Sequence, residues 1–230
     1  MTIELQGVTH RFGDRVVLAD VDLVLAERRI GVVGANGSGK STLARLLNGL
    51  VVPTRGRVLV DGLDTSRQGA AVRRRVGFVF TDPDAQIVMP TVAEDVAFSL
   101  RRSGLDRGQR AARVMQVLQR FGLDGHAHHP AHLLSGGQKQ LLALAAVLVT
   151  EPSVLVCDEP TTLLDARNAR RVADLLSGLP QQLVLVTHHL DQLARFDRVL
   201  VVDAGRIVAD GPPEAGLAAY DDLLAMGSAT

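Results

Sequence analysis

The sequence is poor in cysteine and in the aromatic residues tyrosine and tryptophan. Its 230 residues include one cysteine, Cys157, one tyrosine and no tryptophan. A single cysteine excludes an internal disulfide framework, and nothing points to an oxidising compartment. We interpret Cys157 as a small buried apolar residue rather than a redox centre.

Net charge and long apolar runs are also absent. The chain carries 25 basic and 25 acidic residues. It therefore lacks a global basic field for nucleic acid, and we expect no nucleic-acid partner. The longest aliphatic run, from Leu141 to Val149, is far shorter than the ~20 residues that span a bilayer. With no apolar signal core at its N-terminus, the chain is expected to be soluble and cytoplasmic.

Short strands and amphipathic helices account for most of the sequence. Alternating segments in residues 3–25 and 56–62 predict a small antiparallel sheet. Apolar runs alternate with helical patterns elsewhere and predict a mostly parallel sheet covered on both faces. We expect one domain over 1–230, with a sheet core at 1–90 and 150–211, a helical lobe at about 91–149, and a C-terminal tail at 212–230. The tail is expected to form a short amphipathic helix at most.

The stretch GANGSGKS fits the phosphate-loop pattern G-x-x-x-x-G-K-[ST] in full. It follows an apolar strand and opens a helix, which is the context that this motif requires. Its glycines let backbone N–H groups form an anion nest, Lys40 places a charge on the phosphates, and Ser41 can bind Mg²⁺. The alternative is a glycine-rich turn with an incidental lysine. The predicted nucleotide-binding residues are Gly34, Asn36, Gly37, Ser38, Gly39, Lys40, Ser41 and Thr42.

A second apolar strand, SVLVCDEP, ends in two carboxylates. Beside a phosphate loop, Asp158 can hold Mg²⁺ through water, and Glu159 lies where a general base could polarise the attacking water. The alternative is a strand that ends in ordinary turn acids. The pair predicts a P-loop NTPase of α/β fold with ATP and Mg²⁺ as cofactors.

The stretch LLSGGQKQ distinguishes this chain from other phosphate-loop proteins. Ser135, Gly136 and Gly137 precede a helix expected to begin near Gln138, which makes a second anion-binding helix N-terminus. The alternative is a serine N-cap followed by a flexible turn. One ATP has only one γ-phosphate, so a second site for it suggests the nucleotide of another subunit.

With these motifs the sequence resembles the ATP-binding-cassette ATPases. GANGSGKS, LLSGGQ, SVLVCDEP and VTHH occur in the order of that family, and the resemblance covers about residues 1–211. In that family two cassettes dimerise head to tail, and each ATP lies between one phosphate loop and the other subunit's LSGGQ. The resemblance implies that Leu134, Ser135, Gly136, Gly137 and Gln138 serve the partner's nucleotide.

The same resemblance assigns roles to further residues. Phe12 would stack on adenine, the alternative being a phenylalanine in the core of the hairpin. His188 would be the switch histidine that contacts the γ-phosphate, whereas His189 lies one step past the matching position. The loop that crosses the dimer interface would comprise Thr162, Leu163, Leu164 and Asp165.

The stretch from Val76 to Phe98 most resembles the energy-coupling-factor branch, which powers vitamin and transition-metal uptake. Sequence texture and short length favour the ATPase subunit of biotin uptake, with cobalt or nickel uptake next. The resemblance implies a homodimer or a paralogous second cassette, a transmembrane T-component and a substrate-binding S-component. It also implies a peripheral location on the cytoplasmic face of the inner or plasma membrane. The residues expected to contact the membrane partner are Gln86, Ile87, Val88 and Met89, which could instead fill the core of the lobe.

Two departures from the family pattern affect these expectations. Thr81 stands where the family has a glutamine that reaches Mg²⁺, so Thr81 would need an intervening water to act as a metal-site residue. Many relatives also carry a further C-terminal domain that helps dimerisation, and here dimerisation is expected to depend on ATP and the membrane partner.

A histidine cluster at His126, His128, His129 and His132 invites a metal-binding interpretation. No cysteine or acid accompanies these residues, so solvated loop histidines are the simpler interpretation. Two other functions compete with transport. A non-transport cassette acting on ribosomes or DNA usually carries two cassettes or a coiled-coil insert, and a phosphate-loop kinase would not need LSGGQ.

Overall fold

The computed structural model describes residues 1–227 and divides them into two compact units. Each unit is described by itself below. The first comprises residues 1–76, 153–159 and 179–230, and the second comprises residues 77–152 and 160–178.

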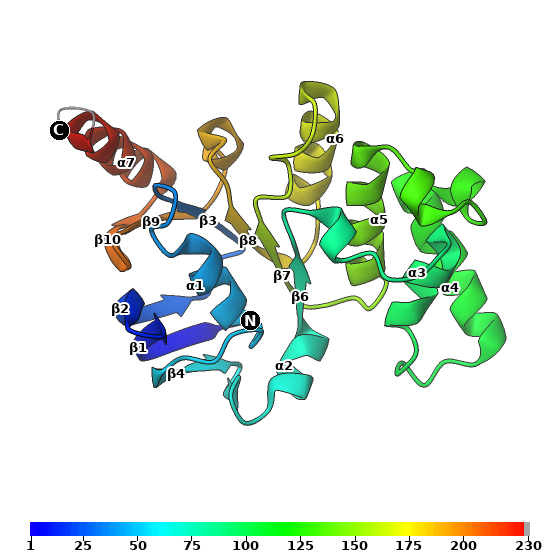
Figure 1. Ribbon diagram of the computed structural model, residues 1–230, viewed down its shortest axis with the longest axis horizontal. Helices are drawn as coiled ribbons and strands as arrows, with labels where there is room; N and C mark the ends of the chain where they lie inside the picture. Colours follow the sequence, from blue (N-terminus) through cyan, green and yellow to red (C-terminus); the bar gives the residue numbers. More distant parts are fainter. Residues whose placement is uncertain (228–230) are drawn as a thin grey trace. The chain divides into compact units, whose positions relative to one another are not determined.

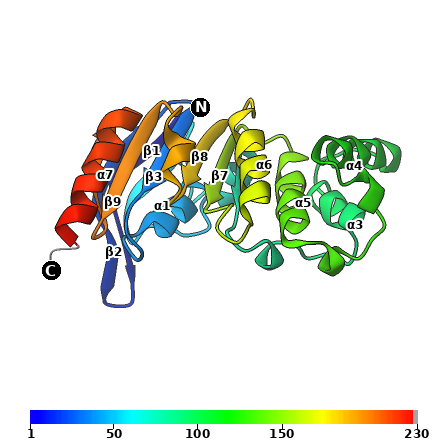
Figure 2. The ribbon, with the colours of Figure 1, turned by 90° about the horizontal axis from the view of Figure 1, so that it is seen from above.

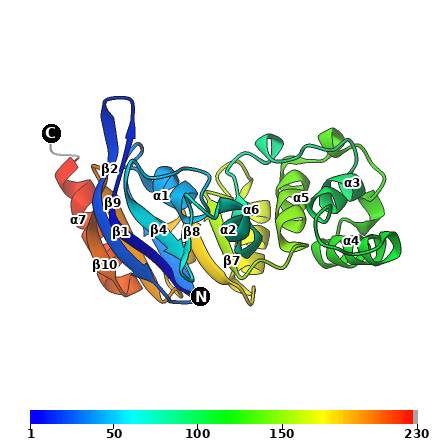
Figure 3. The same cartoon turned by 90° about the horizontal axis from the view of Figure 1, so that it is seen from below.

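An antiparallel sheet forms one layer of the first unit, with the strand order β2-β1-β4-β5. Strands β1 and β2 join through a turn at Gly13, whose positive φ of 58° favours glycine. Figure 3 shows β1, β2 and β4 side by side. This layer matches the antiparallel sheet predicted from alternation. Its strands are β1 (Ile3–Phe12), β2 (Arg15–Leu25), β4 (Arg55–Val60) and β5 (Leu63–Asp64).

The second sheet of the first unit is mostly parallel and has the order β10-β9-β3-β8-β7. Strand β3 pairs in parallel with β8 and β9, and β7 pairs in parallel with β8. Every residue of β3, β7 and β8 is buried, which explains their near-continuous apolar runs. The strands are β3 (Arg29–Val33), β7 (Val154–Asp158), β8 (Gln182–Val186), β9 (Arg198–Asp203) and β10 (Arg206–Gly211).

Three α-helices and one 3₁₀ turn complete the first unit. Figure 1 shows α1 beside the parallel sheet, and Figure 2 shows α7 along β9. The helix α2 was not predicted from the sequence. The elements are α1 (Lys40–Leu47), α2 (Gly69–Arg75), η4 (Leu190–Leu193) and α7 (Pro213–Gly227).

The expectation of a short C-terminal helix at most was wrong about its length. Helix α7 runs for 15 residues. Its Tyr220 is only 7% exposed, and a Cβ at Gly216 would lie 2.8 Å from the Cβ of Val199 on β9. Packing on the sheet therefore extends the helix beyond what its weak periodicity predicts. Residues 228–230 of the predicted tail lie outside the described residues.

Strand β6 (Val76–Val79) leads into the second unit, where α3, α4 and α5 pack against one another. Thr91, Asp106 and Ser135 each form a capping box at the start of one of these helices. Gly122 follows the helical pattern before it, which predicts a helix stop there, and it ends α4 in the left-handed conformation. The elements are η1 (Pro83–Ala85), α3 (Val92–Ser99), α4 (Arg107–Phe121), η2 (Asp124–His126), η3 (Ala131–Leu133), α5 (Gly136–Leu148) and α6 (Ala166–Ser177).

None of the helices in residues 1–227 combines the length and the apolar character needed to cross a bilayer. The predicted division into a sheet core and a lobe at about 91–149 stays a prediction, since the two compact units have different bounds.

Candidate functional site

The parallel sheet gathers three predicted motifs at one edge of the first unit. The phosphate loop follows β3, the two carboxylates end and follow β7, and the histidines follow β8. Since β3, β8 and β7 are adjacent parallel strands, their carboxyl ends meet at that edge.

The phosphate loop needs glycine at two positions for steric reasons. A Cβ at Gly34 would lie 2.1 Å from the carbonyl oxygen of Val202, and one at Gly39 would lie 2.8 Å from that of Val17. Both glycines have positive φ, of 153° and 112°. The loop therefore lies tight against two strands, β9 and β2.

Lys40 is the first residue of α1, and its side chain reaches back to this loop. Its Nζ donates hydrogen bonds to the carbonyl oxygens of Gly34 at 2.8 Å and Ala35 at 2.9 Å. Burial lowers the pKa of Lys40, and the carboxylates of Glu159 and Asp158 partly offset that effect. The ammonium group is thus held at the loop by acceptors that a phosphate could replace.

Ser41 and Asp158 form the pair of oxygen ligands expected for a divalent cation. The Ser41 hydroxyl donates to Oδ1 of Asp158 at 2.9 Å, and a guanidinium nitrogen of Arg45 lies 3.8 Å from Oδ2. Burial raises the pKa of Asp158, and the hydrogen bond from Ser41 and the charge of Arg45 oppose that rise. Hydroxyl and carboxylate oxygens are ligands that suit Mg²⁺. Arg45 was not singled out in the sequence, because an arginine in a helix is usually a solvated residue.

Glu159 and His188 meet at the ends of neighbouring strands. Nδ1 of His188 lies 3.1 Å from Oε2 of Glu159. The backbone of Glu159 has a φ of 51°, a strained value for a residue with a side chain, and its N–H donates to the carbonyl of Val186. Because an ionised carboxylate only accepts, Nδ1 of His188 carries the proton and Nε2 stays available. His189, the less favoured candidate, stacks on His188 at 4.2 Å between ring centroids.

Phe12 lies at the end of β1 with its ring 55% exposed, so it is not the core residue of the hairpin that we considered as an alternative. The ring of His10 meets it edge-on, 4.6 Å between centroids at 82°. His10 itself is buried, and the described residues offer neither of its ring nitrogens a hydrogen-bond partner. Sequence reasoning missed this packing, because His10 occupies a polar position in an alternating strand pattern.

The signature residues belong to the second unit, where they start a helix two residues earlier than expected. Helix α5 begins at Gly136 and not near Gln138, because Ser135 is its N-cap. The Ser135 hydroxyl accepts from the N–H of Gln138, and the Gln138 amide oxygen accepts from the N–H of Ser135. A Cβ at Gly137 would lie 2.5 Å from the side chain of Asn168, which would have to shift, whereas Gly136 faces open space.

The predicted interface loop is partly exposed and ends in a helix cap. Leu163 is 62% exposed. Asp165 accepts a hydrogen bond from the N–H of Asn168 and begins α6. Thr162 and Leu164 complete this loop in the second unit.

The segment expected to contact a membrane partner is tied to the second unit's own helices. The side-chain oxygen of Gln86 accepts from the N–H of Phe80 at 3.1 Å, and its nitrogen donates to the carbonyl of Ala143 at 3.2 Å. The Gln86 side chain thus holds the segment, while Val88, at 63% exposed, presents the apolar surface. Ile87 and Met89 are half-buried, and Thr81 is half-buried as well.

Asp95 is a residue of this region that the sequence analysis missed. Its Oδ1 accepts hydrogen bonds from the N–H groups of Val88 at 2.8 Å and Met89 at 3.0 Å. Its side chain is buried, which raises its pKa, and the two backbone hydrogen bonds oppose that rise. An aspartate on a helix usually faces solvent, so only the buried contacts reveal this role.

Cys157 is buried on β7, as predicted, and burial raises the pKa of its thiol. It is therefore kept as a neutral thiol, which is the unreactive form.

Comparison with known protein families and sequences places these motifs in a wider group. Residues 18–162 match the family described as ABC transporter. A putative ABC transporter ATP-binding protein of Deinococcus radiodurans is 56% identical over 222 residues, which are 96% of this chain and 98% of that protein. The biotin transport ATP-binding protein BioM of Rhizobium etli is 45% identical over 225 residues, which are 98% of this chain and 100% of that protein.

Solved structures agree with the sequence comparisons. CbiO1 of Clostridium perfringens, described as part of the ABC transporter complex CbiONQ, superposes with a TM-score of 0.82 at 32% identity over 97% of this chain and 93% of that one. An ATP-binding cassette described as a dimeric post-hydrolysis state with bound ADP and Pi gives a TM-score of 0.80 at 27% identity, over 92% of this chain and 98% of that one.

Proposed function

We propose that this chain, an ATPase that belongs to the ABC transporter family, energises an energy-coupling-factor-type importer. Biotin is the first candidate substrate. One observation supports the hydrolysis of ATP in this proposal: five side chains with suitable chemistry converge at one sheet edge. They are Lys40, Ser41, Asp158, Glu159 and His188. The full-length match to a protein named for biotin transport supports the choice of biotin, with cobalt or nickel as the next candidates.

In this proposal the residues of the first unit bind and hydrolyse ATP. Backbone N–H groups of the phosphate loop and the ammonium of Lys40 bind the phosphates. Ser41 and Asp158 would hold Mg²⁺, which when bound neutralises charge on the β- and γ-phosphate oxygens. Asp158 is then ionised, because the cation favours its charged form.

Glu159 accepts a proton from the attacking water, and His188 positions its carboxylate through the Nδ1 hydrogen bond. Nε2 of His188 faces away from that bond and is the nitrogen left for the γ-phosphate. Phe12 offers an exposed ring for stacking on adenine.

The signature residues act in this proposal on the nucleotide of a second cassette. The similarity to a cassette described as a dimer supports this arrangement. The partner is a second copy or a paralogous cassette, and the Thr162–Asp165 loop lies at the shared interface.

The importer would also contain a transmembrane T-component and a substrate-binding S-component, as the description of CbiO1 within a transporter complex suggests. The chain would sit on the cytoplasmic face of the membrane. Its contact with the T-component would involve the segment from Gln86 to Met89, and Val88 is the side chain of that segment that is free to meet another protein.

A lysine exchange tests the hydrolytic proposal directly. The chain has only two lysines, Lys40 and Lys139. We expect Lys40→Ala to lower the rate of ATP hydrolysis by about 100-fold or more, because the positive charge that stabilises the transferred phosphoryl group is lost. Lys139→Ala removes a lysine that pairs with Asp84 instead and should retain most of the activity. Equal loss in both variants would contradict the assignment.

The substrate is tested in cells that lack their own biotin uptake and express this chain with its candidate membrane components. Uptake of labelled biotin should depend on Lys40. If cobalt or nickel were transported in place of biotin, and this transport depended on Lys40, the proposed substrate would be wrong and the proposed ATPase role would stand.

A further inference from the structure

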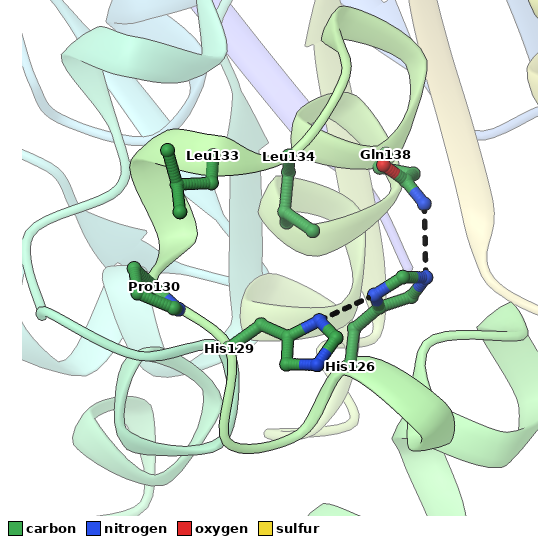
Figure 4. Close-up of a pocket in the computed structure, with 6 residues that line it drawn as sticks. All are labelled: His126, His129, Pro130, Leu133, Leu134 and Gln138. Carbon is green, nitrogen blue, oxygen red and sulfur yellow. Dashed lines mark hydrogen bonds between the residues drawn. The ribbon is translucent and has the colours of Figure 1, made fainter.

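A small cavity of the second unit lies beside the start of the signature helix. Its volume is about 290 Å³, and Figure 4 shows the side chains around it. One wall is apolar and the other carries two imidazoles and an amide. The lining residues are His126, His129, Pro130, Leu133, Leu134 and Gln138.

The polar wall is a chain of hydrogen bonds that runs from the cap of α5 to His129. The Ser135 N–H donates to the amide oxygen of Gln138 at 2.9 Å. The amide nitrogen of Gln138 lies 3.1 Å from Nε2 of His126, and Nδ1 of His126 lies 2.8 Å from Nδ1 of His129. Both imidazole contacts are drawn as dashed lines in Figure 4.

The direction of every bond in this chain follows from its first member. A backbone N–H can only donate, so the Gln138 oxygen faces Ser135 and the Gln138 nitrogen faces His126. An amide nitrogen also only donates, so Nε2 of His126 must accept and its proton resides on Nδ1. That proton is donated to Nδ1 of His129, which must accept. All of these hydrogen bonds form together only when both imidazoles are neutral.

This polarity does not suit a metal ion. The Nδ1 atom of His126 that would face the ion carries the proton, and its Nε2 accepts from Gln138. In metal sites the second nitrogen of a ligating histidine normally donates. The part of the chain that the structure describes also contains no group of three or more metal-ligating residues. The interpretation as solvated loop histidines fits His128, His129 and His132, which are exposed, whereas His126 is half-buried and its ring contacts Gln138 and His129.

The elements next to the pair carry four charged residues close to it in sequence or at helix ends. They are Asp124 in η2, Glu94 on α3, Arg120 on α4 and Lys139 on α5. Lys139 pairs with Asp84, and Glu94 bonds to Thr91. Within residues 1–227 none of these four side chains hydrogen-bonds to either imidazole, so the Gln138 amide is the group outside the pair that responds directly to its protonation.

We propose that His126 and His129 are positioning residues for the signature helix, which hold Gln138 in its cap while both are neutral and release it when either takes up a proton. A proton on Nε2 of His126 would face the N–H of Gln138, and one on Nδ1 of His129 would face the N–H of His126. Either proton places two hydrogen-bond donors opposite each other, so that the hydrogen bond between them is lost. The inference rests on the proposed role of the signature residues in hydrolysis.

An unperturbed histidine changes charge near pH 6.5. The cassette would therefore lose hydrolytic rate as the pH falls, through its signature helix and in addition to any effect at His188. ATP binding to the phosphate loop of the first unit would be unaffected.

The test compares His126→Phe with His128→Phe in the full chain, measuring kcat and KM for ATP between pH 5.5 and 8. Phenylalanine keeps the ring of His126 and removes both nitrogens. We expect kcat at pH 7.5 to fall about 2- to 10-fold, as for loss of one hydrogen bond, and its decline below pH 7 to become shallower. His128→Phe should retain the wild-type profile, including the part due to His188. Identical pH profiles in the two variants would overturn the proposal.

A second measurement does not depend on hydrolysis. In the full chain labelled with ¹⁵N-histidine, NMR should show neutral His126 with its proton on Nδ1 and neutral His129 with its proton on Nε2. The two should titrate together, and Gln138→Leu should decouple His126. Independent titration of both, as for His128, would overturn the proposal. Absence of ATPase activity in the wild-type chain would instead count against the proposed function and leave the NMR result intact.

Discussion

Glu159 shows how the site depends on single residues in costly conformations. Its left-handed backbone and its hydrogen bond to His188 place a carboxylate at the end of β7. The neighbouring Asp158 is buried beside Ser41 with its pKa raised by that burial. Glu159 thus carries backbone strain and Asp158 carries a desolvation cost, and both features are typical of functional sites.

The raised pKa of Asp158 leads to a prediction with a defined sign. When a carboxyl pKa is higher in the folded chain than in the unfolded one, ionisation destabilises the folded state at pH values above the raised pKa. We expect Asp158→Asn to increase the free energy of unfolding of the nucleotide-free chain at pH 7.5. The gain should shrink as the pH falls through the raised pKa of Asp158, because the aspartate is then protonated in the folded chain.

Urea denaturation at several pH values measures this difference, and an ATPase assay serves as the control. Asparagine keeps an oxygen for the Ser41 hydroxyl but loses the negative charge that the proposed Mg²⁺ site uses. The variant should therefore be more stable and inactive. A variant less stable than wild type at pH 7.5 would contradict our account of Asp158.

At the scale of elements, side chains link the segment before α3 to both α5 and α3. Gln86 bonds to the carbonyl of Ala143 on α5, Lys139 pairs with Asp84, and Asp95 bonds to the N–H groups of Val88 and Met89. A force applied at the exposed Val88 would thus be transmitted to the signature helix through side chains that have no role in ATP chemistry.

The role of Asp95 predicts a local loss of order on substitution. Asp95→Leu should leave the N–H groups of Val88 and Met89 without their acceptor and lower the free energy of unfolding by about 1–3 kcal/mol. Amide hydrogen exchange should accelerate at those two residues.

Asp95→Asn keeps an acceptor oxygen and removes a charge that burial disfavours, so it should restore most of the protection. Unchanged exchange at Val88 and Met89 in Asp95→Leu would show that other contacts hold the segment.

The elements that sequence reasoning found are those with strong local signals. Buried strands such as Val154–Asp158, the Ser135 cap and the Gly122 stop are encoded within a few residues. Helix α7 and the bonds of Gln86 and Asp95 depend on residues far apart in the sequence. No local pattern could show that His126 accepts from Gln138, because the bond direction follows from a backbone N–H nine residues after the histidine.

At the scale of the whole molecule, the proposed hydrolysis uses two sets of residues that the chain carries in different compact units. The phosphate loop, the carboxylates and His188 belong to the first unit, and the signature helix belongs to the second. In the proposed mechanism, the signature of one chain completes the nucleotide site of another. Dimerisation should then depend on ATP and on an intact signature cap.

The most direct test is the mass in solution of the Glu159→Gln chain with ATP and Mg²⁺, measured by light scattering with the membrane components present in detergent and without them. Glu159→Gln should bind ATP, hydrolyse it about 10²- to 10⁴-fold more slowly, and accumulate as a cassette dimer. Adding Ser135→Arg should abolish the dimer and leave ATP binding nearly intact. A Glu159→Gln chain that stays a single cassette under saturating ATP in both settings would contradict the account.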